Sequence, residues 1–238
     1  LKNLKKFPKR SYKALLQQLH SWINNLNLKK TKTIWDDYSK TNTYKNKEFE
    51  NKKNVVAEFV AKIKPDQLID LGCNTGQFSE EALEKGANYV IGYAFDQNAV
   101  DEAFKISKSK KINFLPLVFD ASNPSPNQGW MQVERKGFFE RSKAKALIAL
   151  AFEHHLAIAK NIPLDQIIEW IAKLAPFGLI EFVPKIDETV QLMLANREDI
   201  FDEYNELNFE KLLKTKSKII KKTKVSESGR IIYEFETL

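Results

Sequence analysis

The feature that most constrains the fold is a short apolar run that ends in a glycine-rich turn, Leu68-Ile-Asp-Leu-Gly-Cys-Asn-Thr-Gly76. The run from Gln67 to Leu71 predicts a buried strand, and the stretch that begins near Phe78 predicts a helix after the turn. Because Gly72 and Gly76 have no Cβ, the turn can adopt positive φ and let a ligand lie against the backbone. The N–H groups that begin the helix point toward whatever binds there. The segment therefore predicts a ligand site at a strand–turn–helix junction.

Apolar runs alternate with helical patterns along the central part of the chain. Five strands are predicted, at 67–71, 89–93, 112–119, 146–151 and 179–183, and a charged helix is predicted from about Met131 to Ser142. Such alternation is typical of a parallel sheet that helices cover on both faces. Two later strands, about 217–225 and 230–236, form a predicted hairpin. The sequence predicts an α/β fold with a doubly wound, mostly parallel sheet of seven strands.

The residues before the first strand predict an N-terminal extension. Residues 1–46 are expected to form a basic helical cap with an aromatic strap, and residues 47–238 the α/β domain. Apolar side chains from Leu15 to Leu26 recur at helical spacing, so this stretch predicts an amphipathic helix. Two interpretations of Trp35, Tyr38 and Tyr44 stay open: a strap buried against the fold, or a flap that contacts substrate over the cofactor.

Charge is unevenly distributed along the chain. Residues 1–54 hold 14 Lys/Arg and 4 Asp/Glu, a net +10 in a chain whose total is +7, so the remainder carries −3. A basic arm can bind nucleic acid, but scattered lysines more often form a solvated face. We favour the solvated face.

Other features of the composition bound the setting of the protein. One cysteine, Cys73, rules out an internal disulfide and fits a reducing compartment. No window approaches the ~18 apolar residues of a membrane span, and no signal peptide is evident. We therefore expect a soluble cytoplasmic protein with no membrane partner. The chain opens on Leu1, which suggests that it belongs to a longer or processed protein.

The glycine turn resembles motif I of the class I S-adenosylmethionine-dependent methyltransferases, whose form is Asp-x-Gly-x-x-x-Gly. Asp70, Gly72 and Gly76 match this motif residue for residue. A dinucleotide fingerprint would need glycine at 74 and 77, where the chain has Asn74 and Gln77. The resemblance implies the seven-stranded Rossmann-like fold of that family, with S-adenosylmethionine as cofactor.

Further blocks resemble a bacterial subgroup of these enzymes, the nodulation-protein-like methyltransferases. The blocks follow in the expected order: Asn123-Pro-Ser-Pro126, Gly129-Trp130, Glu134-Arg135, Glu140-Arg141, His154-His155-Leu156, Asn161-Ile-Pro-Leu164, Glu181-Phe-Val-Pro-Lys185 and Arg197-Glu-Asp-Ile-Phe201. Substrates of this subgroup are poorly defined, so the resemblance implies a reaction type and little about the acceptor.

The resemblance and the fold together imply the cofactor-binding residues. In an open parallel sheet, ligands bind at the carboxyl ends of the strands. The candidates after the first three strands are Asp70, Gly72, Cys73, Asn74, Gly76, Ala94, Phe95, Asp96, Asp120 and Ala121. Asp120 either meets the adenine amino group or caps its own loop, and Phe95 either stacks on the adenine or belongs to the core.

Ala94 departs from the family pattern. Class I methyltransferases usually carry an acidic residue at this position, and its carboxylate binds both ribose hydroxyls. Losing that acceptor would cost roughly 1.5–3 kcal/mol, about ten- to a hundredfold in affinity. Either Asp96 substitutes, or cofactor binding is weak, or an acidic residue has been replaced deliberately. We favour the last interpretation because the surrounding residues are intact.

The residues after the fourth and fifth strands are candidates for acceptor chemistry. His154 and His155 are the candidate catalytic bases, because imidazole titrates near neutral pH. Adjacent histidines cannot both point the same way, so we expect one at the site and one packed or capping. Glu153 and Glu181 are candidates for substrate binding, and Glu181 could instead neutralise Lys185. No Cys/His spacing predicts a metal site.

These patterns predict methyl transfer from S-adenosylmethionine to an O or N nucleophile of a small molecule, glycan or peptide, weakened by Ala94. Neither an Asn-Pro-Pro-Tyr tetrad nor the Lys-Asp-Lys-Glu set of ribose methyltransferases is present. One alternative is a non-catalytic module that binds cofactor weakly and acts through its N-terminal helix. The other is an RNA methyltransferase that uses the basic arm.

Overall fold

The computed structural model describes residues 7–26 and 46–238, and the chain divides into two units, Leu1–Lys32 and Thr33–Leu238. The first unit contains α1 (Lys9–Asn24), a helix without a buried residue. Trp35, Tyr38 and Tyr44 lie outside the described residues, so the two interpretations of this segment stay predictions. Within the described part of the chain, no helix has the length and apolar character needed to cross a bilayer.

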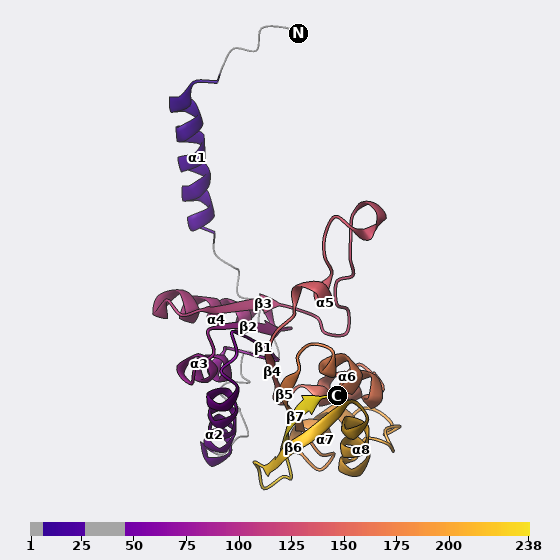
Figure 1. The fold of residues 1–238 in the computed structure, drawn as a ribbon. Helices are drawn as coiled ribbons and strands as arrows, with labels where there is room; N and C mark the ends of the chain where they lie inside the picture. Colours follow the sequence, from indigo (N-terminus) through magenta and orange to yellow (C-terminus); the bar gives the residue numbers. More distant parts are fainter. Residues whose placement is uncertain (1–6, 27–45) are drawn as a thin grey trace. The chain divides into compact units, whose positions relative to one another are not determined.

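The second unit is built on a seven-stranded sheet of order β3-β2-β1-β4-β5-β7-β6, which Figure 1 shows at its centre. The strands are β1 (Gln67–Leu71), β2 (Tyr89–Ala94), β3 (Phe114–Val118), β4 (Ala146–Ala149), β5 (Phe177–Phe182), β6 (Ser217–Lys224) and β7 (Ile231–Thr237). The first five are parallel, and β7 is antiparallel to both β5 and β6. The predicted α/β fold is confirmed.

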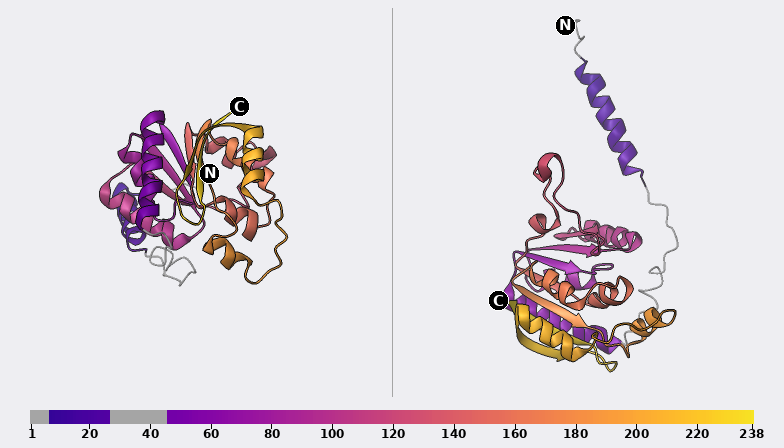
Figure 2. Two further views of the ribbon diagram at one scale, coloured as in Figure 1. Left: turned by 90° about the horizontal axis from the view of Figure 1, so that it is seen from below. Right: turned by 90° about the vertical axis from the view of Figure 1, so that its right-hand side faces the viewer.

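Helices cover both faces of this sheet, as the two views in Figure 2 show. One face carries α2 (Asn46–Ile63), α3 (Gln77–Glu84) and α4 (Gln97–Lys110), and the other carries α6 (Leu164–Ala172), α7 (Glu188–Leu194) and α8 (Glu206–Lys216). Alternate residues of β1 enter different cores: Leu68 packs with Phe59 of α2, whereas Ile69 belongs to the cluster that contains Ile167 of α6. This period of two is the geometry of a strand buried on both faces.

The prediction of a charged helix from Met131 to Ser142 is wrong. This segment holds one 3-10 turn, η1 (Trp130–Gln132), and one helical turn, α5 (Phe138–Arg141). Gln128 and Arg135 exchange two backbone hydrogen bonds of 2.9 and 3.0 Å, which close the segment into a projecting arm (Figure 1). The segment lacks an apolar stripe that could hold a helix against the sheet, so charge and length alone gave a false helix signal.

Replacing Gly76 by alanine is expected to lower the free energy of unfolding by about 2–4 kcal/mol. Gly76 has φ +91°, which L residues rarely adopt, and a Cβ there would overlap the ring of Phe114. Chemical denaturation measures the change. Gly86→Ala is the matched control, because Gly86 has φ +114° and its added Cβ would meet only Lys64 Cγ, at 3.9 Å. Equal losses in both variants would mean that Phe114 does not constrain the turn.

Candidate functional site

The turn between β1 and α3 presents bare backbone at the carboxyl edge of the sheet. Gly72, Asn74 and Gly76 all have positive φ, at +82°, +49° and +91°. The N–H groups of Gly72 and Cys73 donate to the carbonyl of Tyr93, at 2.8 and 3.1 Å, so the turn is fixed to the end of β2. Gly72 is exposed. A ligand can therefore approach the backbone at this point without meeting a side chain of the turn.

Two motif residues face inward instead of toward this surface. The Asp70 carboxylate accepts a 2.6 Å hydrogen bond from Ser79 Oγ of α3, and burial raises the pKa of Asp70 to about 7 despite that bond. Burial also raises the pKa of the Cys73 thiol well above its usual range. Asp70 thus joins β1 to α3, and the geometry offers no direct support for its predicted contact with the cofactor.

The ends of β2 and β3 carry the other predicted cofactor residues. Ala94 is buried, whereas the side chain of Phe95 is 62% exposed. Asp96 caps α4, since its Oδ1 accepts the N–H of Ala99 at 2.8 Å. Ala121, next along the chain after Asp120, is partly buried against the sheet core.

Asp120 lies near a cation that sequence analysis missed. Its Oδ1 accepts hydrogen bonds from the N–H and Oγ of Ser122, as a loop cap does. These bonds, with a contribution from Lys160, lower the pKa of Asp120. The Lys160 ammonium lies 5.4 Å from the centre of the Phe95 ring. Lys160 follows β4 at a distance in sequence, so only the fold brings it to this part of the edge.

The two predicted catalytic histidines differ in environment. They follow β4 and lead into η2 (His155–Ala159), a π-helical turn that the sequence did not predict. His154 is fully buried, and neither of its ring nitrogens has a hydrogen-bond partner. His155 is only partly buried, and the two ring centres are 4.2 Å apart. The two side chains therefore lie side by side, and the expectation that adjacent histidines point in different directions is wrong; His154 is the more buried of the two.

Burial keeps both histidines neutral. The pKa of His154 is lowered well below its usual value by burial, with His155, Arg230 and Lys52 adding to the effect. The pKa of His155 is lowered to about 4 by burial and by the charge of Arg230. At neutral pH both rings are therefore uncharged and able to accept a proton, but the expectation that they titrate near neutral pH is wrong, and the lowered pKa makes each a weaker base than a free imidazole.

A buried ion pair lies beneath this segment. Glu181 of β5 pairs with Lys52 of α2 at 2.6 Å, and both side chains are at most 1% exposed. Glu181 Oε2 also accepts the N–H of Ala151 at 2.7 Å. The alternative in which Glu181 neutralises Lys185 is wrong, because Lys185 pairs with Asp199. Glu181 pairs with the buried Lys52 instead of with Lys185.

A second buried pair adjoins the first. Arg230, which precedes β7, donates from Nε and Nη2 to the two carboxylate oxygens of Asp187, at 2.7 and 2.6 Å. Arg230 Nη1 also lies 4.0 Å from Glu181 Oε1. Lys52 and Arg230 are thus matched by Glu181 and Asp187, and the buried charge of these four residues sums to zero.

Glu153 is a fifth ionisable group in this region, and its contacts indicate that it carries a proton. Burial raises the pKa of Glu153 to about 8, and Glu181 adds to this shift. The single hydroxyl proton of Tyr204 faces two acceptors, Glu153 Oε1 at 2.8 Å and the carbonyl of Val183 at 2.7 Å. If Glu153 is protonated on Oε1, it donates to Tyr204, which donates to Val183, and both contacts are satisfied.

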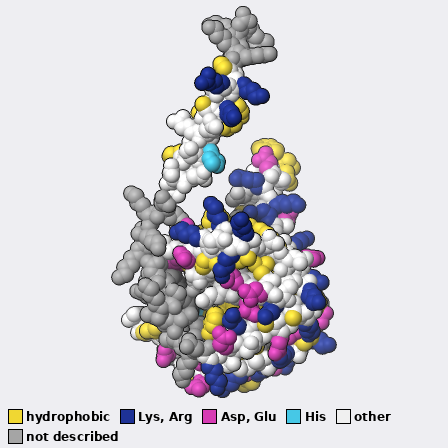
Figure 3. Space-filling view, turned by 90° about the vertical axis from the view of Figure 1, so that its left-hand side faces the viewer, with side chains coloured by type: hydrophobic (Ala, Val, Ile, Leu, Met, Phe, Trp, Pro, Cys, Tyr) yellow, Lys and Arg dark blue, Asp and Glu magenta, His cyan; other side chains and the backbone are white. Residues whose placement is uncertain are grey.

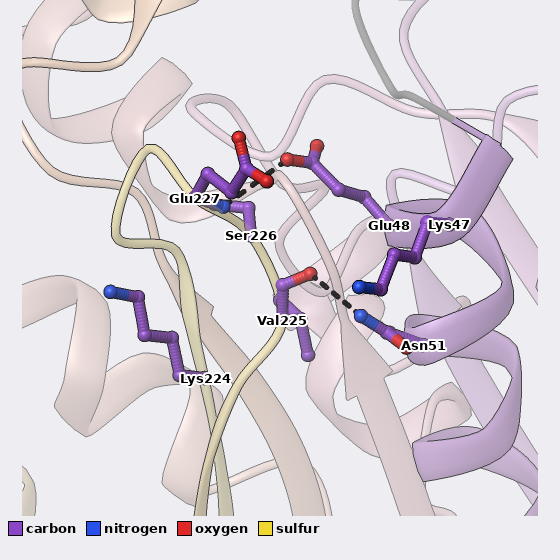
Figure 4. A pocket seen from close by; sticks show the side chains of 7 residues that line it. All are labelled: Lys47, Glu48, Asn51, Lys224, Val225, Ser226 and Glu227. Carbon is purple, nitrogen blue, oxygen red and sulfur yellow. Dashed lines mark hydrogen bonds between the residues drawn. The ribbon is translucent and has the colours of Figure 1, made fainter.

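A pocket of about 230 Å³ opens beside these groups at the same edge (Figure 4). It lies between the first turn of α2 and the turn that joins β6 to β7, and its lining residues are Lys47, Glu48, Asn51, Lys224, Val225, Ser226 and Glu227. Asn51 Nδ2 donates to the carbonyl of Val225 at 3.3 Å, which closes one side. Asn51 precedes Lys52, and Ser226 Oγ accepts the N–H of Arg230. The pocket wall is therefore continuous with the buried ion pairs.

Glu153→Gln is expected to remove a pH-dependent loss of stability. An acid whose pKa rises on folding binds more protons when folded, so stability falls as pH rises from the ordinary glutamate pKa of 4.5 to about 8, and then levels off. Glutamine keeps the shape of the protonated acid and does not titrate. Between pH 4.5 and about 8, the free energy of unfolding should therefore fall more in the unsubstituted protein than in Glu153→Gln. Denaturant midpoints at several pH values measure this difference.

The exposed Glu203→Gln change serves as a surface control for that series. A parallel pH dependence of the natural protein and Glu153→Gln would contradict a protonated Glu153.

One curated protein is similar in sequence to almost the whole chain. No family model matches the chain. It is 51% identical over 233 residues to the nodulation protein NoeA of Rhizobium meliloti, a match that covers 98% of this chain and 49% of that protein. The chain therefore spans about half the length of this curated relative.

Solved methyltransferases share the architecture at low sequence identity. The N-methyltransferase NodS from Bradyrhizobium japonicum matches with a TM-score of 0.56 and 9% identity, over 81% of this chain and 97% of NodS. An rRNA methylase from Escherichia coli matches with a TM-score of 0.55 and 13% identity, over 98% of this chain and 86% of the methylase. The chain therefore has the class I methyltransferase fold and is a homologue of nodulation protein NoeA.

Proposed function

We propose that this chain is an S-adenosylmethionine-dependent methyltransferase that acts on an O or N nucleophile of a small molecule, glycan or peptide. The observation that carries the proposal is the turn from Gly72 to Gly76, whose positive φ values leave the backbone of Gly72 exposed at the carboxyl edge. This edge also holds the histidine pair and the buried ion pairs. Its fold is that of proteins described as methylases, and its relative NoeA is described as a nodulation protein.

The residues at the carboxyl edge fit most of a nucleoside cofactor. Gly72 offers exposed backbone, the N-terminal N–H groups of α3 follow the turn, and Phe95 offers an exposed aromatic face after β2. When bound, S-adenosylmethionine supplies a methyl group on a sulfonium, which is displaced in line by the acceptor. The protein's main task is then to align the acceptor and to take its proton.

The ribose hydroxyls are the part of the cofactor that fits least well. Ala94 provides no acceptor, and Asp96 uses Oδ1 to cap α4. Asp96 could bind a ribose only with its second oxygen or by giving up the cap, which is worth about 1 kcal/mol. Ala94 therefore remains the residue that we expect to limit cofactor affinity.

His155 is the better candidate for the base. Both histidines are neutral, but His154 is fully buried and His155 reaches partial exposure. A base must come within hydrogen-bond reach of the proton that it accepts, so exposure decides between the two. In this proposal His154 packs behind His155, and Glu153 helps to hold the segment by its bond to the N–H of Val183.

Ala94→Asp is expected to tighten binding of S-adenosylhomocysteine by about ten- to a hundredfold, because the carboxylate restores the acceptor for the ribose. Calorimetric titration of both proteins measures the change. Ala99→Asp, in the first turn of α4, is the control for a new negative charge nearby. Affinity that does not rise in Ala94→Asp, with the fold intact by thermal unfolding, would exclude the missing acid as the weak point. Binding by neither protein would favour the non-catalytic alternative.

His155→Gln is expected to lower the rate of methyl transfer by about 10²–10⁴-fold, the usual contribution of a general base. The measurement is release of S-adenosylhomocysteine with the best acceptor from a panel of hydroxyl compounds, amines, glycans and peptides. Cofactor binding should change little. His20→Gln on α1 is the matched control. A rate that falls for His154→Gln but not for His155→Gln would reverse the assignment.

A further inference from the structure

The positive charge of this protein is concentrated in its first unit. Residues 1–32 contain nine Lys/Arg and no Asp/Glu, whereas the whole chain has a net charge of only +7. Residues 33–238 therefore carry a small net negative charge. A segment with many cations and no acids is electrostatically complementary to an anionic surface.

The helix in this unit is amphipathic. Its large apolar side chains are all exposed, by 45–61%, and they are Tyr12, Leu15, Leu16, Leu19, Trp22 and Ile23, with Leu26 two residues beyond the helix. At 100° per residue they form a stripe of roughly 120°. The three cations of the helix lie outside this stripe: Lys9 borders it, and Lys13 and Arg10 lie further round, with Arg10 opposite its centre. In Figure 3 apolar side chains and Lys/Arg side chains are both visible along α1, and no acidic side chain is.

A partner of α1 has to cover its apolar stripe and also pair with its cations, and this distinguishes three kinds of partner. A nucleic acid would use the cations but would leave the apolar stripe in water. A second copy of α1 would cover the stripe but would bring like charges together without any acid to pair them. An anionic lipid surface satisfies both faces, because acyl chains cover the stripe and headgroups meet the cations. Trp22 on the apolar stripe fits this arrangement, since tryptophan prefers the boundary between lipid and water.

We propose that α1 lies on an anionic lipid surface, with its apolar stripe toward the acyl chains and Lys9, Arg10 and Lys13 toward the headgroups. This helix would hold the methyltransferase unit near a membrane. The proposal replaces the sequence-based expectation of no membrane partner, which rested on the lack of a spanning segment. It does not depend on the proposed reaction.

The test is co-sedimentation of the full chain with vesicles of phosphatidylcholine alone and vesicles of equal parts phosphatidylcholine and phosphatidylglycerol. We expect more than about tenfold tighter binding to the anionic vesicles. Gln17→Asp, on the polar face, should weaken that binding by about fivefold, the effect of one charge. Leu19→Asp adds the same charge and also interrupts the apolar stripe. It should therefore bind the anionic vesicles at least about tenfold more weakly than Gln17→Asp does.

A second variant tests the cations without disturbing the apolar stripe. Lys9→Gln/Lys13→Gln should lose affinity for the anionic vesicles and not for the neutral ones. Absence of vesicle binding, equal binding to both vesicles, or equal effects of Gln17→Asp and Leu19→Asp would overturn the proposal. So would self-association that Leu19→Asp abolishes, or tighter binding to a single-stranded RNA that Leu19→Asp leaves unchanged. No readout requires methyl transfer, so failure here is distinct from failure of the proposed function.

Discussion

The ion pair between Lys52 and Glu181 is the interaction on which the carboxyl edge depends. Neither side chain meets solvent appreciably, so each charge would be uncompensated without the other. Removing one partner of such a pair typically costs 3–5 kcal/mol. Glu181 also accepts the N–H of Ala151, a non-glycine residue held at φ +48°. The pair thus connects the first turns of α2, the end of β5 and the turn after β4, and it supports the backbone that carries the histidines.

The balance of buried charge explains why neighbouring groups are neutral. Lys52 and Arg230 already match Glu181 and Asp187, so an ionised Glu153 would add an unpaired charge in a region of low dielectric. Burial lowers the pKa of His154, and the charges of Arg230 and Lys52 add to that effect. The ion pairs therefore support the geometry of the segment after β4, while burial in the same region is the main cause of the neutral state of Glu153 and His154.

Sequence patterns predicted the sheet well because they report local burial. The β1 boundaries agree with the predicted 67–71, and β6 and β7 form the predicted antiparallel hairpin. Motif I located the glycine turn because the turn depends on glycines at fixed positions in one short segment. The helix predicted at 131–142 was wrong because the prediction used charged residues in a segment that has no apolar stripe to pack against the sheet. The Lys52–Glu181 pair joins residues 129 positions apart, and Lys52 resembles every other lysine in a lysine-rich helix. Contacts of this kind arise from packing, which no local pattern records.

The pairing at the edge also bears on the acceptor. Phosphate recognition usually needs cations that can turn toward the ligand, with arginine forks preferred. The two cations buried at this edge, Lys52 and Arg230, each already hold a carboxylate. A phosphate would have to displace one of these carboxylates and leave it buried without its partner. A neutral hydroxyl or amine makes no such demand, because it needs only alignment and a base. The buried pairs at this edge therefore offer no phosphate site, in keeping with the acceptor proposed above, and the lysines of the edge that lie outside these pairs include Lys47 and Lys224, which line the nearby pocket.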